Sequence, residues 1–174
     1  IHQDWTVTDE EKYGSYTIWI PLDDTTKNNG ALRVIDGSHL VENNFRSPSL
    51  PVSFDKHRVA LEKYLKTLSI KKGNAFVFNQ KLMHASWQNK TNENRLALTI
   101  GLVPKDADLF MLYYDASKKQ VSKYAMQDDL FLHYPEIIKA PTIGKLVETF
   151  SYRVKEFTED DLKNTLYQNR IKSN

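Results

Sequence analysis

Short apolar runs, separated by residues typical of turns, fill the first hundred positions of the chain. We expect strands at Tyr16–Leu22, Ala31–Ile35, Ala75–Phe78 and Leu96–Val103. These segments are rich in β-branched and aromatic residues, which favour extended structure. Turn sequences such as Asn28-Asn29-Gly30 and Gly73-Asn74 lie between them. Strand, turn and strand at this rhythm predict a small β-barrel or jelly roll.

The last third of the chain has a different pattern. Apolar residues recur at helical spacing over residues 142–154 and again over residues 158–170. Thr158, followed by acidic residues and by Asp161 three positions later, predicts a capped helix start. We therefore expect one domain over residues 1–174, with a β-barrel core over 1–104 and a helical C-terminal extension over 105–174. Residues 42–55 predict a long loop, and His57–Leu68 fits a short helix or a ragged strand equally well.

Composition narrows the possible function classes. The 174 residues are 40% hydrophobic and 26% charged, which favours a folded domain over a disordered chain. A net charge of +2 gives no reason to expect nucleic acid or a membrane as a partner. The sequence contains no cysteine, so any metal must be held by nitrogen and oxygen ligands. A soluble, cytoplasmic protein that acts on a small molecule fits best.

The pair His2 and Asp4 is the first candidate for chemistry. On a strand, residues two positions apart point to the same face, so an imidazole and a carboxylate at this spacing can bind one cation. Two histidines and one carboxylate on one face of an octahedron leave positions open, which suits iron(II) oxygenases. An exposed polar pair is the alternative, because a short His-x-Asp motif arises easily by chance.

His84 and Arg95 are the second and third candidates. His84 follows an apolar strand, and the alternative is a core histidine bonded to a backbone carbonyl. The polar segment 89–94 could form a hairpin loop that places Arg95 on the neighbouring strand, facing the same interior. A buried guanidinium needs an anion, and a dicarboxylate could supply one by a bidentate pair. A surface salt bridge, for example with Glu93, is the commoner fate of an arginine.

An ordered set of motifs resembles the phytanoyl-CoA dioxygenase family, a branch of the Fe(II)/2-oxoglutarate oxygenases. The matching stretches are His2–Asp4, Trp19–Asp24, Asn28–Leu32, Ile35–His39, Gly73–Ala75 and His84–Ser86 with Arg95. They cover roughly the first hundred residues in the expected order.

The resemblance implies a mainly β fold with flanking α, a double-stranded β-helix (cupin-like) with C-terminal helices. It implies that His2, Asp4 and His84 bind Fe(II) and form the catalytic centre, and that Arg95 binds the cosubstrate 2-oxoglutarate. Ser86 and Trp19 would lie near that cosubstrate. The implied activity is a dioxygenase that hydroxylates, or otherwise oxidises, an aliphatic C–H bond with O2 and releases succinate and CO2.

Asp4 also bears on the type of reaction. Related halogenases have a small residue where the carboxylate would be, so Asp4 favours hydroxylation over halogenation. The family normally has a substantial region ahead of the His-x-Asp motif, and we expect these 174 residues to be one piece of a longer chain.

Two other functions remain open from the sequence alone. One is a non-catalytic or decayed β-barrel module that binds a metal or ligand, and the other is a cupin-like isomerase or lyase. Trp5, Tyr13, Arg33 and the loop 42–55 are candidates to line a substrate pocket. Neither the substrate nor the oligomeric state can be predicted.

Overall fold

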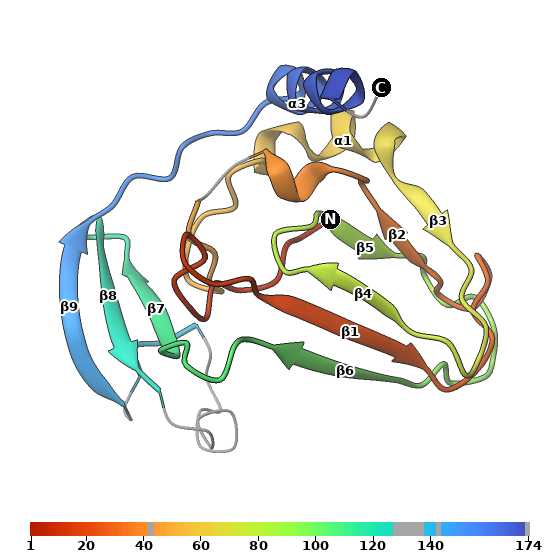
Figure 1. Cartoon of the computed structure of the whole chain (residues 1–174), viewed down its shortest axis with the longest axis horizontal. Coiled ribbons are helices and arrows are strands. Elements are labelled where there is room, and N and C mark those ends of the chain that lie inside the picture. The colour runs from red at the N-terminus through yellow and green to blue at the C-terminus, as the bar shows by residue number, and fades with distance from the viewer. Residues whose placement is uncertain (42–43, 127–137, 142–143, 173–174) are drawn as a thin grey trace.

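Three antiparallel sheets and one long helix make up the computed structural model, which describes residues 1–41, 44–126, 138–141 and 144–172 (Figure 1). The first sheet has the order β4-β1-β6 and contains β1 (Tyr16–Pro21), β4 (Phe76–Asn79) and β6 (Ala97–Leu102). The second has the order β3-β2-β5 and contains β2 (Leu32–Val34), β3 (Lys66–Leu68) and β5 (His84–Ser86). The third has the order β7-β8-β9 and contains β7 (Phe110–Asp115), β8 (Gln120–Ala125) and β9 (Lys145–Ser151).

The chain alternates between the first two sheets as it proceeds. It passes from β1 to β2, from β3 to β4 and from β5 to β6, and each step crosses from one sheet to the other. Strands of both sheets pair only in the antiparallel sense. Two facing sheets with this winding form a double-stranded β-helix, so the predicted fold class is confirmed. Figure 1 shows the two sheets facing each other on one side of the molecule and the third sheet beyond them.

Buried apolar side chains hold these layers together in three clusters. One lies between the two facing sheets and contains Trp19, Leu32, Val34, Phe78 and Leu82. A second joins the helical side to the barrel and contains Ile35, Phe54, Leu61, Met83, Phe157 and Leu162. The third packs the third sheet on the loop after residue 44 and contains Leu50, Phe110, Leu112 and Val121. Burial of apolar surface in these clusters fixes the positions of β1, through Trp19, and of Leu82 and Met83, which lead into β5.

Short helical turns and one long helix cover the top of the barrel in Figure 1. They are η1 (Ser38–Leu40), η2 (Asp55–His57), α1 (Arg58–Leu61), η3 (Glu62–Tyr64) and α3 (Glu159–Lys172). The segment 57–68 therefore contains both of the structures expected for it, a helix and then strand β3. The predicted start of α3 is confirmed, because the Asp161 backbone N–H donates to Thr158 Oγ1 and the Thr158 N–H donates to Asp161 Oδ2. Among the residues that the structure describes, no helix is long and apolar enough to cross a membrane.

The helix predicted over residues 142–154 is wrong. Lys145–Ser151 forms strand β9, which pairs with β8 from Gln120 to Ala125. The spacing of Leu146, Val147 and Phe150 fits both periods, and Val147, Thr149 and Phe150 are good strand formers. Pairing with the open edge of β8 decides in favour of the strand. Strands β7 and β8 were not predicted. Together with β9 they make the described part of the region after residue 105 partly a β-sheet, not the helical extension expected over 105–174. Residues 142–143 of the expected helix lie outside the described ranges.

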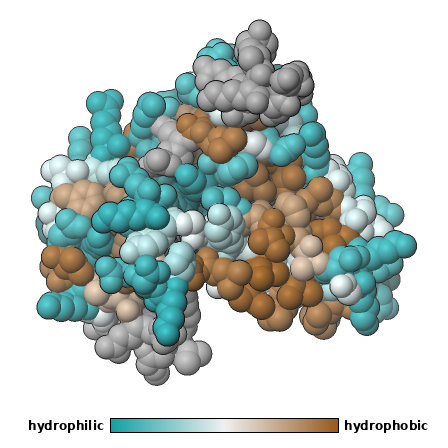
Figure 2. All heavy atoms as spheres, viewed as in Figure 1, coloured by the Kyte–Doolittle hydropathy of each residue, from teal (hydrophilic) through white to brown (hydrophobic). Residues whose placement is uncertain are grey.

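One face of the first sheet is apolar and open to solvent. Tyr16, Leu22, Val77, Leu96, Leu98, Ile100 and Leu102 are all exposed large hydrophobic residues. The register pairs Tyr16 with Leu102 and Ile18 with Ile100, so they share one side of the sheet. Figure 2 shows the resulting hydrophobic patch over β1 and β6. The opposite side of the same strands carries Thr17, Trp19 and Thr99, which face the candidate site.

Candidate metal centre

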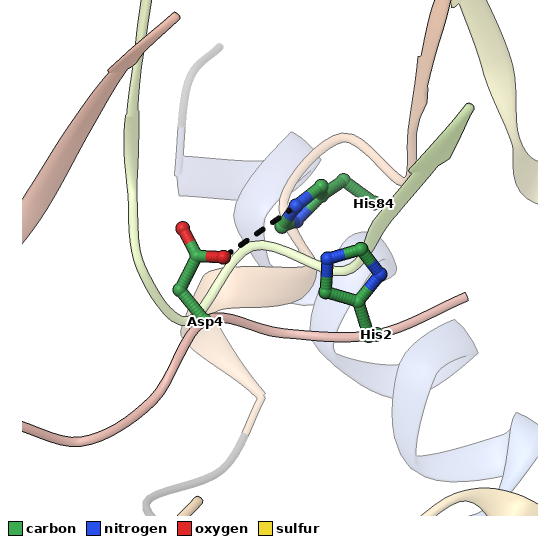
Figure 3. A group of neighbouring side chains, drawn as sticks. All are labelled: His2, Asp4 and His84. Atoms are coloured by element: carbon green, nitrogen blue, oxygen red, sulfur yellow. Dashed lines mark ion pairs between the residues drawn. The ribbon is translucent and has the colours of Figure 1, made fainter. Parts of the chain in front are cut away.

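Three side chains from two distant parts of the sequence converge at one end of the barrel (Figure 3). His2 and Asp4 come from the first segment of the chain, and His84 is the first residue of β5. His2 and His84 form a reciprocal backbone pair, each N–H donating to the other's carbonyl at 2.9 Å. The Asp4 N–H donates to the Gln80 carbonyl at 3.0 Å. One ligand atom from each of the three side chains lies within 4.8 Å of the others.

His84 is buried and its ring orientation is fixed. Its Nδ1 lies 2.9 Å from the Leu82 carbonyl oxygen, which only accepts, so Nδ1 carries the proton. The lone pair is therefore on Nε2, which lies 3.6 Å from Asp4 Oδ1. The alternative considered for His84, a core histidine bonded to a backbone carbonyl, thus describes one ring nitrogen, while the same bond turns the other nitrogen toward the cluster.

Asp4 is oriented by a threonine that the sequence analysis did not single out. Thr17 Oγ1 donates a hydrogen bond of 2.6 Å to Asp4 Oδ2, which leaves Oδ1 for another partner. Thr17 is buried on β1, two positions before Trp19. Because residues two apart on a strand share a face, the prediction that Trp19 lies near the site could have drawn attention to Thr17.

His2 lies at the open edge of the cluster and packs against His84, with ring centroids 4.1 Å apart. Partial desolvation, and then the charge that a protonated His84 would carry, lower the pKa of His2 to about 4. At neutral pH the imidazole is therefore uncharged and has a lone pair to offer a metal. The two histidines also avoid the repulsion that two imidazolium groups would cause at this distance.

Arg95 lies beside the same site, in a cavity of about 260 Å³. This cavity is lined by the three cluster residues and by Thr17, Trp19, Leu32, Phe78, Ala85, Ser86, Arg95 and Thr99. The Arg95 guanidinium lies 5.2 Å from the centroid of the Trp19 ring. Within the described ranges, no hydrogen bond or ion pair of Arg95 is seen, so the alternative considered for it, a surface salt bridge with Glu93, is absent there.

Glycine at position 30 leaves room beside that guanidinium. Gly30 has a φ of 92°, which L-residues rarely adopt, and a Cβ there would lie 3.2 Å from the Trp87 carbonyl oxygen and 3.6 Å from Arg95 Nε. Ser86 follows His84 on the same face of β5, as predicted, and its register partner is Leu32.

The predicted hairpin before Arg95 is wrong, because β5 and β6 belong to different sheets. The segment 89–94 instead crosses from one sheet to the other, and Arg95 comes just before β6. Arg95 still lines the same cavity as His84, because the two sheets face each other around that space.

The donor set fits a divalent first-row metal ion. Two neutral imidazole nitrogens and one carboxylate oxygen form the set typical of non-haem iron(II) sites. The 3.6 Å between His84 Nε2 and Asp4 Oδ1 compares with about 3 Å between adjacent corners of an octahedron whose bonds are about 2.1 Å. All three ligand atoms lie within 4.8 Å of one another, so the side chains would move inward to close on an ion. The unpaired guanidinium in the adjoining cavity fits the far carboxylate of a dicarboxylate cosubstrate.

The fold and this arrangement define a class of jelly-roll protein with a candidate metal centre in its open end. A sequence model of the phytanoyl-CoA dioxygenase family matches residues 1–97, and the chain belongs to this family. The predicted resemblance is thereby confirmed.

Similarity to individual proteins agrees with this membership. The chain is 29% identical to phytanoyl-CoA dioxygenase of Arabidopsis thaliana over 109 residues. This aligned region covers 60% of the chain and 38% of the relative. A relative from Dictyostelium discoideum is 29% identical over 122 residues, covering 67% of the chain and 34% of that protein. The chain thus spans about a third of the length of the curated relatives it matches.

Solved structures give more distant likenesses. A non-haem monooxygenase, ThoJ in its apo form, is 20% identical and has a TM-score of 0.49, covering 99% of this chain and 59% of that one. The α-ketoglutarate-dependent epimerase SnoN is 21% identical and has a TM-score of 0.44, covering 63% of this chain and 42% of that one.

Proposed function

We propose that this domain is the catalytic core of an Fe(II)- and 2-oxoglutarate-dependent dioxygenase that hydroxylates, or otherwise oxidises, an aliphatic C–H bond of a small molecule. In the hydroxylation, one atom of O2 enters succinate and the other enters the product, while 2-oxoglutarate loses CO2. The bound iron and cosubstrate would supply the oxidising chemistry. The chain's own residues hold, orient and shield these groups.

Each site residue has a role that follows from its contacts. His2, Asp4 and His84 would hold the metal through three atoms on one side, leaving the other side for cosubstrate and O2. The Leu82 carbonyl fixes the tautomer of His84, and Thr17 fixes the rotation of the Asp4 carboxylate. Arg95 would bind the far carboxylate of 2-oxoglutarate with its planar guanidinium.

Neighbouring groups would complete the cosubstrate site. The Ser86 hydroxyl is available as a further donor to the carboxylate, since it makes no hydrogen bond within the described ranges. The Trp19 ring, in contact with the Arg95 guanidinium, would restrict the orientations of that group. Phe78 and Leu32 form apolar walls that exclude water from the same space.

One observation carries the proposal: a triad that could hold a metal ion and an arginine without a carboxylate partner among the described residues line the same cavity. A triad alone is compatible with a metal-binding module of any kind. A partly buried guanidinium with no anion beside it is well placed to bind one, and the far carboxylate of a dicarboxylate would supply that anion.

Anaerobic titration tests the metal and the cosubstrate separately. We expect Fe(II) to bind the wild-type chain and 2-oxoglutarate to add a visible absorption band when it chelates the metal. His84→Ala should abolish the band, whereas His39→Ala, a matched change of a histidine in η1 outside the triad, should preserve it. Arg95→Lys keeps the charge but loses the planar pair of donors, so it should weaken the binding of 2-oxoglutarate without weakening the binding of Fe(II).

Turnover is read from succinate release, which should require both Fe(II) and 2-oxoglutarate. Retention of succinate release in His84→Ala would contradict the proposed ligand set. Fe(II) binding with no 2-oxoglutarate-dependent band would leave a metal-binding module without the oxygenase reaction. Zinc or manganese content in the purified protein, with no response to 2-oxoglutarate, would point to a cupin-like isomerase or lyase.

A further inference from the structure

A second cavity lies next to the candidate metal centre and meets the first at His2. It has a volume of about 200 Å³ and is formed by the first residues of the chain and by the loop over residues 44–54. His2 lines both cavities, whereas Asp4 and His84 line only the first, so a metal held by the three would lie in the first cavity with the His2 side chain beside the second. Arg95, with no carboxylate partner in the described ranges, lines only the first.

Most of the wall of this second cavity is apolar. Its aromatic and aliphatic lining residues are Trp5, Phe45, Pro48, Leu50, Pro51, Val52 and Phe54. Leu50 and Phe54 are buried and belong to two of the core clusters, so this part of the wall is anchored to the fold. Tyr13 and Arg33, two of the residues considered for a substrate pocket, do not line it.

Arg46 is the single permanent cation among the described residues that line this cavity, and its charge is already compensated. Its Nη2 donates to Glu10 Oε1 at 2.6 Å, and both side chains are only 10% exposed. Its Nε donates to the Asp4 carbonyl at 2.7 Å and its Nη1 donates to the Asn44 carbonyl at 3.1 Å. These bonds hold the guanidinium against the protein, so it offers little to an anionic ligand.

Two neutral polar groups remain in the wall. The Ser53 hydroxyl makes no hydrogen bond to another described residue, although the Ser53 carbonyl accepts one from the Phe157 N–H at 3.0 Å. Gln3 donates through Nε2 to the Lys81 carbonyl at 2.6 Å, which leaves its side-chain oxygen as an acceptor. A hydroxyl, carbonyl or amide on a ligand could pair with these groups.

We propose that this second cavity holds the part of the substrate that is oxidised, and that this part is a neutral, mainly apolar group with one or two uncharged polar atoms. The inference rests on the proposed function, because a C–H bond in this cavity can be oxidised only if the oxidising centre lies beside His2. Away from the metal, a carboxylate or phosphate is strongly disfavoured, since the described residues of the wall offer a buried anion no free cation. The two cavities thus divide their ligands by charge, with the anionic cosubstrate beside Arg95 and the neutral substrate beside Val52.

Two probes of nearly equal shape test the charge preference. Cyclohexanecarboxamide is neutral and cyclohexanecarboxylate is its anionic counterpart. Binding is followed by saturation-transfer NMR on the complete chain, first without metal and then with Mn(II) and saturating 2-oxoglutarate. Mn(II) binding itself is measured by electron paramagnetic resonance, and the bound ion should broaden the carboxamide ring protons because the probe lies beside it.

Substitution at Val52 shows whether a probe is in this cavity. Val52→Trp fills the space and should remove the carboxamide signal, whereas Val59→Trp makes the same change at a side chain that is 89% exposed and outside the cavity. We count as cavity binding only the signal that Val52→Trp removes. By this measure the carboxamide should bind at least about tenfold more tightly than the carboxylate.

Glu10→Gln tests the stated cause of that preference. It removes the charge that compensates Arg46 and keeps a side chain of similar shape, so carboxylate binding should strengthen relative to the carboxamide. An unchanged ratio would show that the ion pair does not set the preference.

Three results would overturn the inference: equal or tighter binding of the carboxylate, a carboxamide signal that survives Val52→Trp, or bound Mn(II) that leaves the carboxamide unbroadened. Failure to bind Mn(II) would instead contradict the proposed metal centre. In that case a carboxamide signal sensitive to Val52→Trp would still support a cavity selective for neutral ligands. The wild-type comparison of the two probes stands even if the Val52→Trp variant does not fold.

Discussion

Thr17 offers the sharpest test of how the candidate metal centre is organised. Its hydroxyl donates the 2.6 Å hydrogen bond that fixes Asp4 Oδ2, and Thr17 is 4% exposed. Thr17→Val replaces the hydroxyl by a methyl group of similar size and keeps a β-branched residue in strand β1. The packing is therefore preserved while the carboxylate loses the group that sets its rotation.

The size of the effect can be worked out from the contacts. A hydrogen bond to a charged group contributes about 1.5–3 kcal/mol. Loss of a partner that orients a metal ligand typically weakens metal binding by about 10–100-fold, equivalent to about 1.4–2.8 kcal/mol. The Asp4 side chain is 27% exposed, so water can replace part of the lost bond. We therefore expect the lower end, a rise of about tenfold in the Kd for Mn(II) or Fe(II).

Titration of Mn(II), with the free ion followed by electron paramagnetic resonance, measures this Kd directly. Thr17→Ser keeps the hydroxyl and should restore most of the affinity. Thr99→Val makes the same change at a cavity residue opposite Trp19 that makes no hydrogen bond to Asp4, and it should leave the Kd within about twofold of wild type. A Kd for Thr17→Val as close to wild type as that control would refute the claim that Thr17 orients a metal ligand.

Three further predictions concern the cosubstrate, pH and the C-terminal helix. Arg95→Met should raise the Kd of 2-oxoglutarate at least about tenfold in an anaerobic absorbance titration, because a charge-assisted pair is lost. Side-chain hydrogen bonds, of which the one from Lys63 has the largest effect, lower the pKa of Glu159 from 4.5 to about 2. The stability that this carboxylate contributes is therefore complete above pH 4.5 and is lost as the pH falls through about 2. Glu159→Gln should flatten the corresponding loss of helix content in acid, measured by circular dichroism. Leu162→Ala should lower the free energy of unfolding by about 2–5 kcal/mol in a urea titration, while Leu146→Ala, at a half-exposed side chain, should cost less than about 0.5 kcal/mol.

The sequence predicted those parts of the fold in which local pattern and tertiary context agree. Strand β1 is an example, because its β-branched and aromatic residues alternate between a buried and an open face. Strand β9 was missed because the spacing of its apolar residues fits a helix as well as a strand, and the partner strand β8 lies outside any local window. Long-range pairing of this kind cannot be read from one segment.

The candidate site shows the same division. The motifs around His2, Asp4 and His84 identified the triad, and the structure brings the three side chains together, although their role as metal ligands remains a prediction. Thr17 has no motif of its own, because its part depends on the rotation of a side chain contributed by another segment. The second cavity was anticipated in part, because Trp5 and the loop 42–55 were candidates for a substrate pocket, and Trp5 and most of residues 44–54 line it. Its shape was not predicted, since that depends on how a loop with little periodicity packs against Trp5.

The backbone pair between His2 and His84 has a consequence for the behaviour of the whole domain. An ion shared by His2, Asp4 and His84 would tie the first strand-like segment to β5 as a cross-link does, in addition to the two backbone hydrogen bonds. A ligand at a hundred times its Kd stabilises the folded state by about 2.7 kcal/mol. Removal of the metal by a chelator should therefore loosen this junction first, and faster hydrogen exchange at the amides of His2, Asp4 and His84 would report the loss of metal without any enzymatic assay.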